Sequence, residues 1–432
     1  MGLLALVTSS AEAGVRHADR RALRDLFILL DGKSWKAAER WDLSGDADPC
    51  EVQWYGVGCD DPCDMMMEAV IEARAKQLPP EIKAKQTTNP YAGVVLYPED
   101  LDCREGRITS IELRANGLRG DLSKWTSVGQ LRNLSILDLS HNGNLTGSLP
   151  TEMGKLRDLV HLDVSGNDIE GHLPDLAAVN SYPDGLFKLD TLNVAANRLS
   201  GTLPTQLGLH TLLSRLDVNF NSRISGTLPT ELGNLNARLE VIYARYNSID
   251  GTLPTQLGRL SELRFLELAN NLAISGTLPP ALGGLMSLRE FGLNENRISG
   301  SLPTELCLTT SLRQLFLSNN RLEGNLTKFW SMGQWESLIT LDLYNNSMSG
   351  DVPPAITRLK SLRYLFLDQT HMGPLTRFYC HQRLPLTMHF GKKFNSYVFR
   401  DRYYEYMASE CKDPWDVNLA FNPLSKWGQY AD

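Results

Sequence analysis

Apolar and polar positions alternate in a short phrase that recurs along most of the chain. In residues 314–318 (QLFLS), Leu315 and Leu317 are separated by Phe316 and flanked by Gln314 and Ser318. Alternation with a period of two is typical of a short strand whose leucines point inward and whose other residues point outward. The pattern therefore predicts one short strand in each copy of the phrase.

An asparagine follows each strand phrase and sets the period of the repeat. A turn-and-leucine phrase comes next, as in SGTLP at residues 225–229, where the glycine allows the turn and the leucine adds a second apolar layer. One unit cannot bury its apolar face alone, but a stack of units can. We expect the asparagines to turn inward and satisfy buried backbone groups. The asparagine recurs every 24 to 30 residues, at Asn116, Asn142, Asn167, Asn197, Asn221, Asn247, Asn271, Asn296, Asn320 and Asn346.

The full unit, LxxLxxLxLxxNxLxGxLPxxLGxL, resembles the plant-type leucine-rich repeat of receptor-kinase ectodomains, receptor-like proteins and polygalacturonase inhibitors. The segment DRRALRDLF from Asp19, Trp41, and PCEVQWYGVGC at residues 49–59 resemble the N-terminal cap of that family. The resemblance implies an α/β solenoid, an arc of about ten to eleven repeats with short parallel strands on its concave face and disulfide-stabilised caps. It also implies recognition of peptides, steroids, enzymes or other ectodomains.

The repeat pattern divides the chain into four predicted parts. Residues 1–13 resemble a signal-peptide remnant, 14–105 a cap with an insert, 106–373 the solenoid, and 374–432 an aromatic-rich C-terminal cap. The insert contains a short predicted helix from Asp64. We expect the insert and the tail to cover the ends of the solenoid, with docking of a partner as the alternative.

Six of the seven cysteines fall in the predicted caps, which indicates disulfides in an oxidising compartment. The family resemblance pairs Cys50 with Cys59 and leaves Cys63 with Cys103, although other pairings stay open, and Cys380 with Cys411 ties the tail. Cys307 takes the place that glycines hold in other repeats. We expect it to be a small free thiol packed on the convex side, with an intermolecular disulfide as the alternative.

Several features indicate a secreted or cell-surface protein that does not bind nucleic acid. No apolar run of 18 residues is present for an ordinary membrane span. The net charge of −7 argues against phosphate backbones as the main partner. Four sequons are candidate glycosylation sites, at Asn133, Asn144, Asn325 and Asn345.

The inward positions are committed to packing, so binding specificity must lie on outward positions or in the caps. An outward column begins with Glu112, Asp138 and Asp163, which we interpret as solvated acids, with recruitment of Ca²⁺ or a basic partner as the alternative. Further along, aromatic residues mix with arginine, the types that carry protein or sugar recognition. The predicted binding patch comprises Arg215, Asp217, Phe220, Tyr243, Arg245, Tyr246, Phe265 and Glu267.

No catalytic, metal or cofactor motif stands out, so we predict no enzyme activity, no cofactor and no metal site. The predicted function is extracellular recognition of a protein or a glycan through the concave face. The alternative is a structural subunit of an extracellular assembly that docks through its insert and aromatic tail.

Overall fold

The computed structural model describes residues 14–15, 17–36, 56–60, 105–174, 176, 185–325, 334–350, 359–367, 371–372 and 387–389. The chain divides into two compact units. The first comprises residues 1–169 and 178–186, and the second comprises residues 170–177 and 187–432. The boundaries assigned above to the caps and the solenoid stay predictions.

One amphipathic helix, α1 (His17–Leu29), packs on the repeats of the first unit. Its residues Ala22, Leu23 and Leu26 are fully buried, and the indole N–H of Trp125 donates a hydrogen bond of 2.9 Å to the carbonyl of Ala22. The bond matters because the indole is itself fully buried and needs an acceptor. The helix that the segment from Asp19 predicted is therefore present.

The first unit contains the first parallel strands of the repeat. The long strand β3 (Glu105–Glu112) pairs in parallel with β1 (Gly14–Val15) and with β5 (Ile136–Asp138), and β5 pairs with β7 (His161–Asp163). The cap strand β2 (Val57–Asp60) is antiparallel to β3. The unit is completed by β4 (Arg119–Asp121), β6 (Asn144–Thr146), and the 3-10 helices η1 (Gly32–Ser34), η4 (Leu122–Lys124), η5 (Thr126–Gln130) and η6 (Thr151–Lys155).

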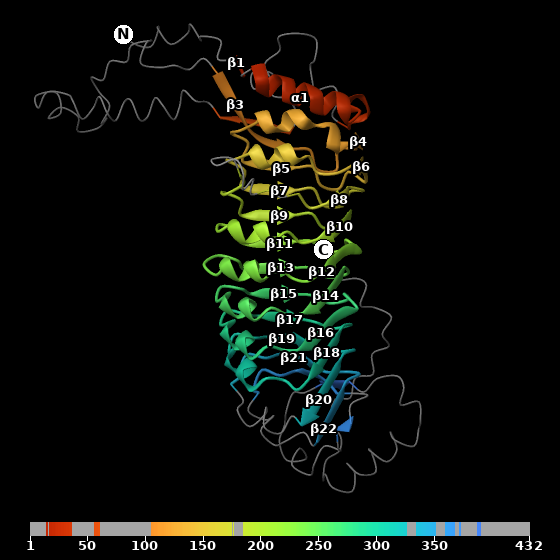
Figure 1. The fold of residues 1–432 in the computed structure, drawn as a ribbon, viewed down its shortest axis with the longest axis vertical. Helices are drawn as coiled ribbons and strands as arrows, with labels where there is room; N and C mark the ends of the chain where they lie inside the picture. Colours follow the sequence, from red (N-terminus) through yellow and green to blue (C-terminus); the bar gives the residue numbers. More distant parts are fainter. Residues whose placement is uncertain are drawn as a thin grey trace, which may run out of the picture. The chain divides into compact units, whose positions relative to one another are not determined.

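The second unit repeats a strand, a second strand and usually a 3-10 helix, and like elements stack on one another (Figure 1). Its first sheet consists in order of β9 (Thr191–Asn193), β11 (Arg215–Asp217), β13 (Val241–Tyr243), β15 (Phe265–Glu267), β17 (Glu290–Gly292), β19 (Gln314–Phe316), β21 (Thr340–Asp342), β23 (Tyr364–Phe366) and β25 (Thr387–His389). Each of these strands pairs in parallel with its neighbours, as the repeat predicted.

A second parallel sheet and a row of 3-10 helices complete the second unit. The sheet runs through β8 (Glu170–His172), β10 (Arg198–Thr202), β12 (Arg223–Gly226), β14 (Ser248–Thr252), β16 (Ala273–Thr277), β18 (Arg297–Gly300), β20 (Arg321–Asn325), β22 (Ser347–Gly350) and β24 (His371–Met372). The helices are η7 (Thr205–Leu209), η8 (Thr230–Asn234), η9 (Thr255–Arg259), η10 (Pro280–Gly284) and η11 (Thr304–Leu308).

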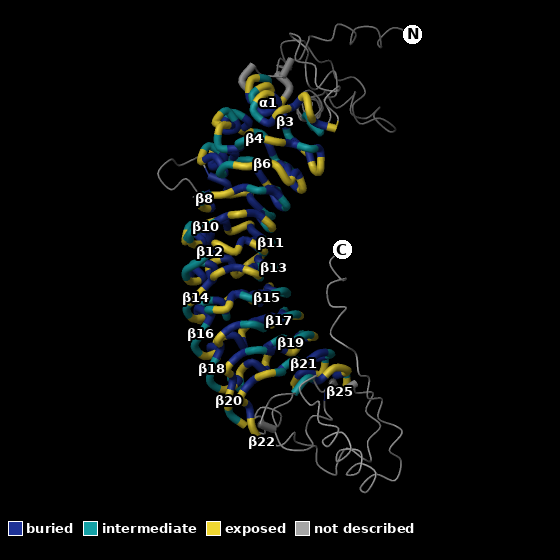
Figure 2. The backbone as a smooth tube through the Cα atoms, turned by 90° about the vertical axis from the view of Figure 1, so that its right-hand side faces the viewer, coloured by how far each residue is buried: buried dark blue, intermediate teal, exposed yellow. Residues whose placement is uncertain are grey.

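Leucines fill the space between these layers. Leu315 and Leu317 are fully buried, as the alternating pattern predicted, and Phe291 takes a leucine position in its own repeat. In the second unit, buried residues lie between the odd-numbered and the even-numbered strands (Figure 2). Because inward positions carry this packing, the outward residues of each strand are free for other roles.

The repeating asparagines form a buried ladder. All ten are at most 9% exposed. The side-chain amide of Asn271 donates to the carbonyl of Leu268 in its own repeat (2.8 Å) and to that of Ala244 in the preceding one (3.0 Å), while its oxygen accepts from the Ile249 N–H (3.1 Å). One side chain thus satisfies backbone groups of two repeats. The inward turn predicted for these asparagines is confirmed.

A column of small residues allows the 3-10 helices to stack closely. A Cβ on Gly233 would lie 2.6 Å from the carbonyl oxygen of Gln256 in the next helix, so a larger residue there would collide with backbone. Cys307 occupies the equivalent place and is 3% exposed with a free thiol. Burial raises the pKa of this thiol to about 11. The expected buried free cysteine is therefore confirmed.

Several predicted features lie outside the described residues. Cys59 takes part in a disulfide, but Cys50, Cys63, Cys103, Cys380 and Cys411, the signal-like residues 1–13 and the helix predicted from Asp64 are not described. Within the predicted C-terminal cap, strand β25 extends the first sheet in parallel with β23, which the sequence pattern did not predict. In the part of the chain that is described, no helix is long and apolar enough to cross a membrane.

Replacing a ladder asparagine should weaken the fold. Asn271→Ala leaves two buried carbonyls and one buried N–H without their side-chain partner, and we expect a loss of about 3 kcal/mol in the free energy of unfolding. Urea unfolding followed by circular dichroism measures it. Asn294→Ala is the matched control, because only its main-chain carbonyl is bonded among the described residues, and its cost should stay within about 0.5 kcal/mol.

Two substitutions in the column of small residues should differ in their cost to stability. Gly233→Ala should cost about 2 kcal/mol, because the new Cβ meets backbone in the next 3-10 helix. Cys307→Ala, at the equivalent position, should cost about 1 kcal/mol or less, since it only removes one atom. The same unfolding measurement compares the two, and an equal cost would contradict the stacking argument.

Candidate functional site

The eight residues of the predicted binding patch lie on neighbouring repeats of the second unit. Strands β11, β13 and β15 are adjacent and in register, so that Asp217 lies opposite Tyr243, and Tyr243 lies opposite Glu267. Val241 in turn lies opposite Phe265. The register therefore brings the strand residues of the patch side by side, as the repeat period predicted.

Contacts join the first half of the patch. The Arg215 guanidinium forms an ion pair of 3.1 Å with Asp217, and its central carbon lies 4.9 Å from the centre of the Tyr243 ring. Tyr243 in turn meets Phe265 edge to face, with ring centres 6.3 Å apart. An arginine held between a carboxylate and an aromatic face is pre-oriented, so it loses little side-chain entropy on binding a partner.

The second half of the patch is an exposed aromatic stack. Phe220 and Tyr246 lie face to face, with ring centres 4.7 Å apart and planes 10° from parallel. They remain 53% and 42% exposed. Each occupies the left-handed turn at the equivalent place in its own repeat, with φ of 56°. The Arg245 guanidinium lies 5.9 Å from the centre of the Tyr246 ring. Two large rings exposed side by side are costly in water and favour contact with a partner.

Arg245 connects the stack to a buried carboxyl pair. Its Nε lies 3.7 Å from a carboxylate oxygen of Glu267, which is only 4% exposed. Glu267 also shares a hydrogen bond with Glu290 on the next strand. Gly292 makes this arrangement possible, because a Cβ there would collide with the Glu267 carboxyl. The Glu267 side chain thus fills the gap that Gly292 leaves in the outward column.

The carboxyl pair holds a proton at neutral pH. Burial, followed by the charge of Glu290, raises the pKa of Glu267 to about 8, although Arg245 opposes the shift. Burial also raises the pKa of Glu290, while its hydrogen bond with Glu267 lowers it. Burial therefore favours the protonated form of both carboxyl groups, and a proton held by the pair allows one carboxyl group to donate to the other.

Sequence reasoning missed Glu290 and the role of Gly292. The available signal was the glycine itself, which interrupts a column of larger outward residues. Recognising the pair also requires the register of β15 with β17, in which Phe265 lies opposite Glu290 and Glu267 lies opposite Gly292. The pair is therefore diagonal across two strands.

The other candidate groups have plainer surroundings. Asp138 and Asp163 of the acidic column lie opposite each other in register. Among the described residues, no three histidine, cysteine or acidic side chains are grouped as metal ligands would be. Of the sequon asparagines, Asn144, Asn325 and Asn345 are exposed, whereas Asn133 is half-buried. Apart from strand β25, the aromatic tail lies outside the described residues.

Comparison with known proteins agrees with the repeat. The Leucine Rich Repeat family model matches residues 133–156 and 337–359. Receptor-like protein 39 of Arabidopsis thaliana is 34% identical over 98 residues, which is 23% of this chain and 10% of that protein. The chain thus spans only a small part of such curated relatives.

Solved structures give the same result. The ectodomain of the receptor kinase GASSHO1/SCHENGEN3 from Arabidopsis thaliana, in complex with CASPARIAN STRIP INTEGRITY FACTOR 2, is 28% identical with a TM-score of 0.60, covering 74% of this chain and 37% of that one. The Arabidopsis HAESA ectodomain, in complex with a peptide hormone, is 28% identical with a TM-score of 0.56, covering 77% and 53%. The repeats, the family model and these relatives together support a plant-type leucine-rich-repeat protein.

Proposed function

We propose that this chain is a non-catalytic extracellular recognition protein that binds a peptide or protein through the patch on β11, β13 and β15. The observation that carries the proposal is the exposed Phe220–Tyr246 stack, which lies on neighbouring repeats with two arginines that are each held by a carboxylate. Aromatic and arginine side chains held rigidly together are typical of binding hot spots. The peptide complexes of the two related ectodomains support a partner of this kind.

The chemistry of the patch favours a partner with an apolar anchor beside polar groups. The Phe220–Tyr246 stack offers apolar surface, while Arg215 and Arg245 are each held by a neighbouring carboxylate. Paired in this way, the arginines can donate hydrogen bonds without leaving a bare charge in the interface. A glycan on this patch remains an alternative within the proposal.

An extracellular location is part of the proposal. The disulfide at Cys59 supports an oxidising compartment, and the exposed sequons at Asn144, Asn325 and Asn345 are accessible for glycosylation. The alternative function, a structural subunit, depends on the insert and the tail. The insert lies outside the described residues, and only strand β25 of the tail is described, so no observation favours this alternative over recognition.

The carboxyl pair makes the patch sensitive to pH. Deprotonating Glu267 would place a second charge beside Glu290, and the nearby Arg245 would offset it only in part. Above a pH of about 8 the two carboxylates repel each other, and the packing around Tyr243 and Phe265 is disturbed. Binding through the patch should therefore be strongest at neutral and mildly acidic pH.

Removing the aromatic stack should abolish partner capture. Phe220→Gly with Tyr246→Gly keeps residues that tolerate the left-handed turn while deleting both rings, and we expect at least a thirtyfold weaker association, as for hot-spot truncations of about 2 kcal/mol. The measurement is recovery of cross-linked partners by the tagged full chain in its native source, quantified by mass spectrometry.

Leu209→Gln is the matched control for the stack variant. It removes an apolar side chain that is 44% exposed on helix η7 rather than on the strands. Partners should be recovered with this variant as with the unmodified chain, and all three proteins should unfold at similar temperatures. Equal recovery with the stack variant would contradict the proposed patch.

The fold should lose stability as Glu267 ionises. Because its pKa is raised in the folded state from 4.5 to about 8, the protonated form is stabilising below pH 4.5, and that contribution falls as the pH rises to about 8. Glu267→Gln keeps a donor for Glu290 without a charge. The unfolding free energy of the Glu267→Gln protein in urea should therefore increase relative to that of the unmodified chain, by on the order of 2 kcal/mol between pH 5 and pH 8.5. Parallel curves for the two proteins would show that Glu267 does not titrate in this range.

A further inference from the structure

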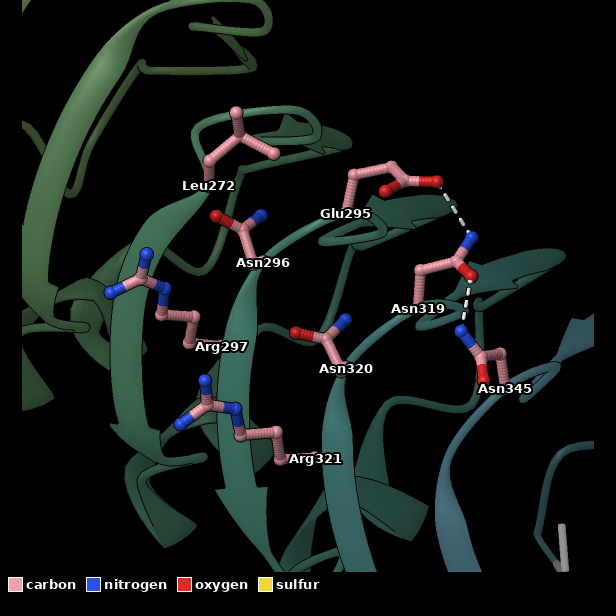
Figure 3. Close-up of a pocket in the computed structure, with 8 residues that line it drawn as sticks. All are labelled: Leu272, Glu295, Asn296, Arg297, Asn319, Asn320, Arg321 and Asn345. Atoms are coloured by element: carbon pink, nitrogen blue, oxygen red, sulfur yellow. Dashed lines mark hydrogen bonds between the residues drawn. The ribbon is translucent and has the colours of Figure 1, made fainter. Parts of the chain in front are cut away.

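A groove outside the patch lies where the asparagine ladder turns into the second sheet. It has a volume of about 440 Å³ and sits beside strands β18 and β20 of the second unit. Seven of its eight lining residues are polar, and four of those are asparagines. Figure 3 shows the lining: Leu272, Glu295, Asn296, Arg297, Asn319, Asn320, Arg321 and Asn345.

Two arginines form one side of the groove. Arg297 begins β18 and Arg321 begins β20, and their side chains extend in the same direction (Figure 3). Both side chains are exposed, and neither guanidinium group makes an ion pair or a hydrogen bond with any residue that the structure describes. Like charges on neighbouring strands destabilise each other. An anion between them would remove that repulsion and could accept from both guanidinium groups.

An ordered chain of amides forms the other side. Asn345 donates from its side-chain nitrogen to the oxygen of Asn319 (2.8 Å), and Asn319 donates in the same way to Glu295 (2.7 Å). These bonds fix the orientation of both amides. They also occupy the carboxylate of Glu295, the one acidic residue among the eight that line the groove. Side-chain amides both donate and accept hydrogen bonds, which is what a ligand rich in hydroxyl groups requires.

The floor of the groove carries an unsatisfied acceptor. The side-chain oxygen of Asn296 is buried and accepts no hydrogen bond within the described chain. In the next repeat, the oxygen of Asn320 accepts from the Ile298 N–H (2.9 Å), and that of Asn346 accepts from the Leu322 N–H (3.0 Å). Asn296 therefore departs from the ladder at the place where the groove opens. A buried polar atom without a partner calls for an explanation, and a role in binding a ligand is one.

Leu272, at the rim, departs from the pattern as well. It adopts a left-handed backbone conformation with φ of 59°, which disfavours a residue with a branched side chain. Its side chain is 62% exposed. Strained residues tend to persist at ligand sites, and an exposed aliphatic group can cover the apolar face of a sugar ring.

We propose that this groove binds an acidic saccharide. Its carboxylate or sulfate group lies between Arg297 and Arg321, its hydroxyl groups bond to Asn319 and Asn345, and Leu272 covers one ring face. An acidic peptide fits the lining less well, because a peptide needs apolar contacts for its side chains and the groove offers only one apolar residue. The site shares no residue with the patch, so it does not depend on the proposed function.

The test is isothermal titration of the full chain carrying Ser347→Ala, which removes the sequon at Asn345 but keeps its side chain. The probes are a trisaccharide of a hexuronic acid, a sulfated trisaccharide, the neutral trisaccharide and a short poly-aspartate peptide. We expect saturable binding of a charged saccharide that weakens with rising salt, and no binding of the neutral one. The two charged saccharides distinguish carboxylate from sulfate as the bound group.

Arg297→Gln and Arg321→Gln should each weaken that binding about tenfold or more, as the loss of a charge-assisted hydrogen bond does. Arg223→Gln is the matched control, because Arg223 begins β12 at the corresponding place in another repeat but does not line the groove. It should change affinity less than twofold. The Phe220→Gly, Tyr246→Gly chain should bind the saccharide normally, which separates this site from the patch.

Four outcomes would overturn the proposal. They are no binding of either charged saccharide at millimolar concentration, equal binding of the neutral trisaccharide, equal weakening by Arg223→Gln, and tighter binding of the poly-aspartate peptide with the same arginine dependence. The last of these would identify a peptide site instead.

Discussion

The fold depends on satisfying backbone groups where each repeat turns into its interior. A chain that bends between two buried layers leaves carbonyl and N–H groups that water cannot reach. The asparagine side chain donates to the carbonyl groups and accepts from the N–H group. Its hydrogen bonds reach both its own repeat and the one before it. Each repeat therefore depends on hydrogen bonds to its neighbour, which explains why a single repeat is not stable on its own.

This constraint divides the residues of each repeat into two classes. Leucines, asparagines and the glycines of the helix row are fixed by packing, so they carry little information about a partner. Outward residues are free, and they gather in two regions with different chemistry. One combines aromatic rings with paired arginines and a shared proton, and the other combines unpaired arginines with ordered amides. A rigid scaffold holds both without further ordering.

The period made most of this architecture predictable, since it fixes both the inward face and the register between strands. The patch followed because Tyr243 and Glu267 are one period apart. Glu290 was missed because it contacts Glu267 diagonally, through a gap that only Gly292 leaves. The groove was missed because it depends on the left-handed turn of Leu272 and on the direction of the asparagine amides. Strand β25 could not be predicted, since it follows the repeats and carries none of their signature.

Cys307 has a practical consequence for studying how such a stack opens. Its thiol is buried in the row of 3-10 helices, and its pKa of about 11 keeps it protonated at ordinary pH. A thiol reagent can therefore reach and modify it only when the repeat around it separates from its neighbours. The rate of modification reports the frequency of that local opening, so the native sequence contains its own probe of cooperativity between repeats.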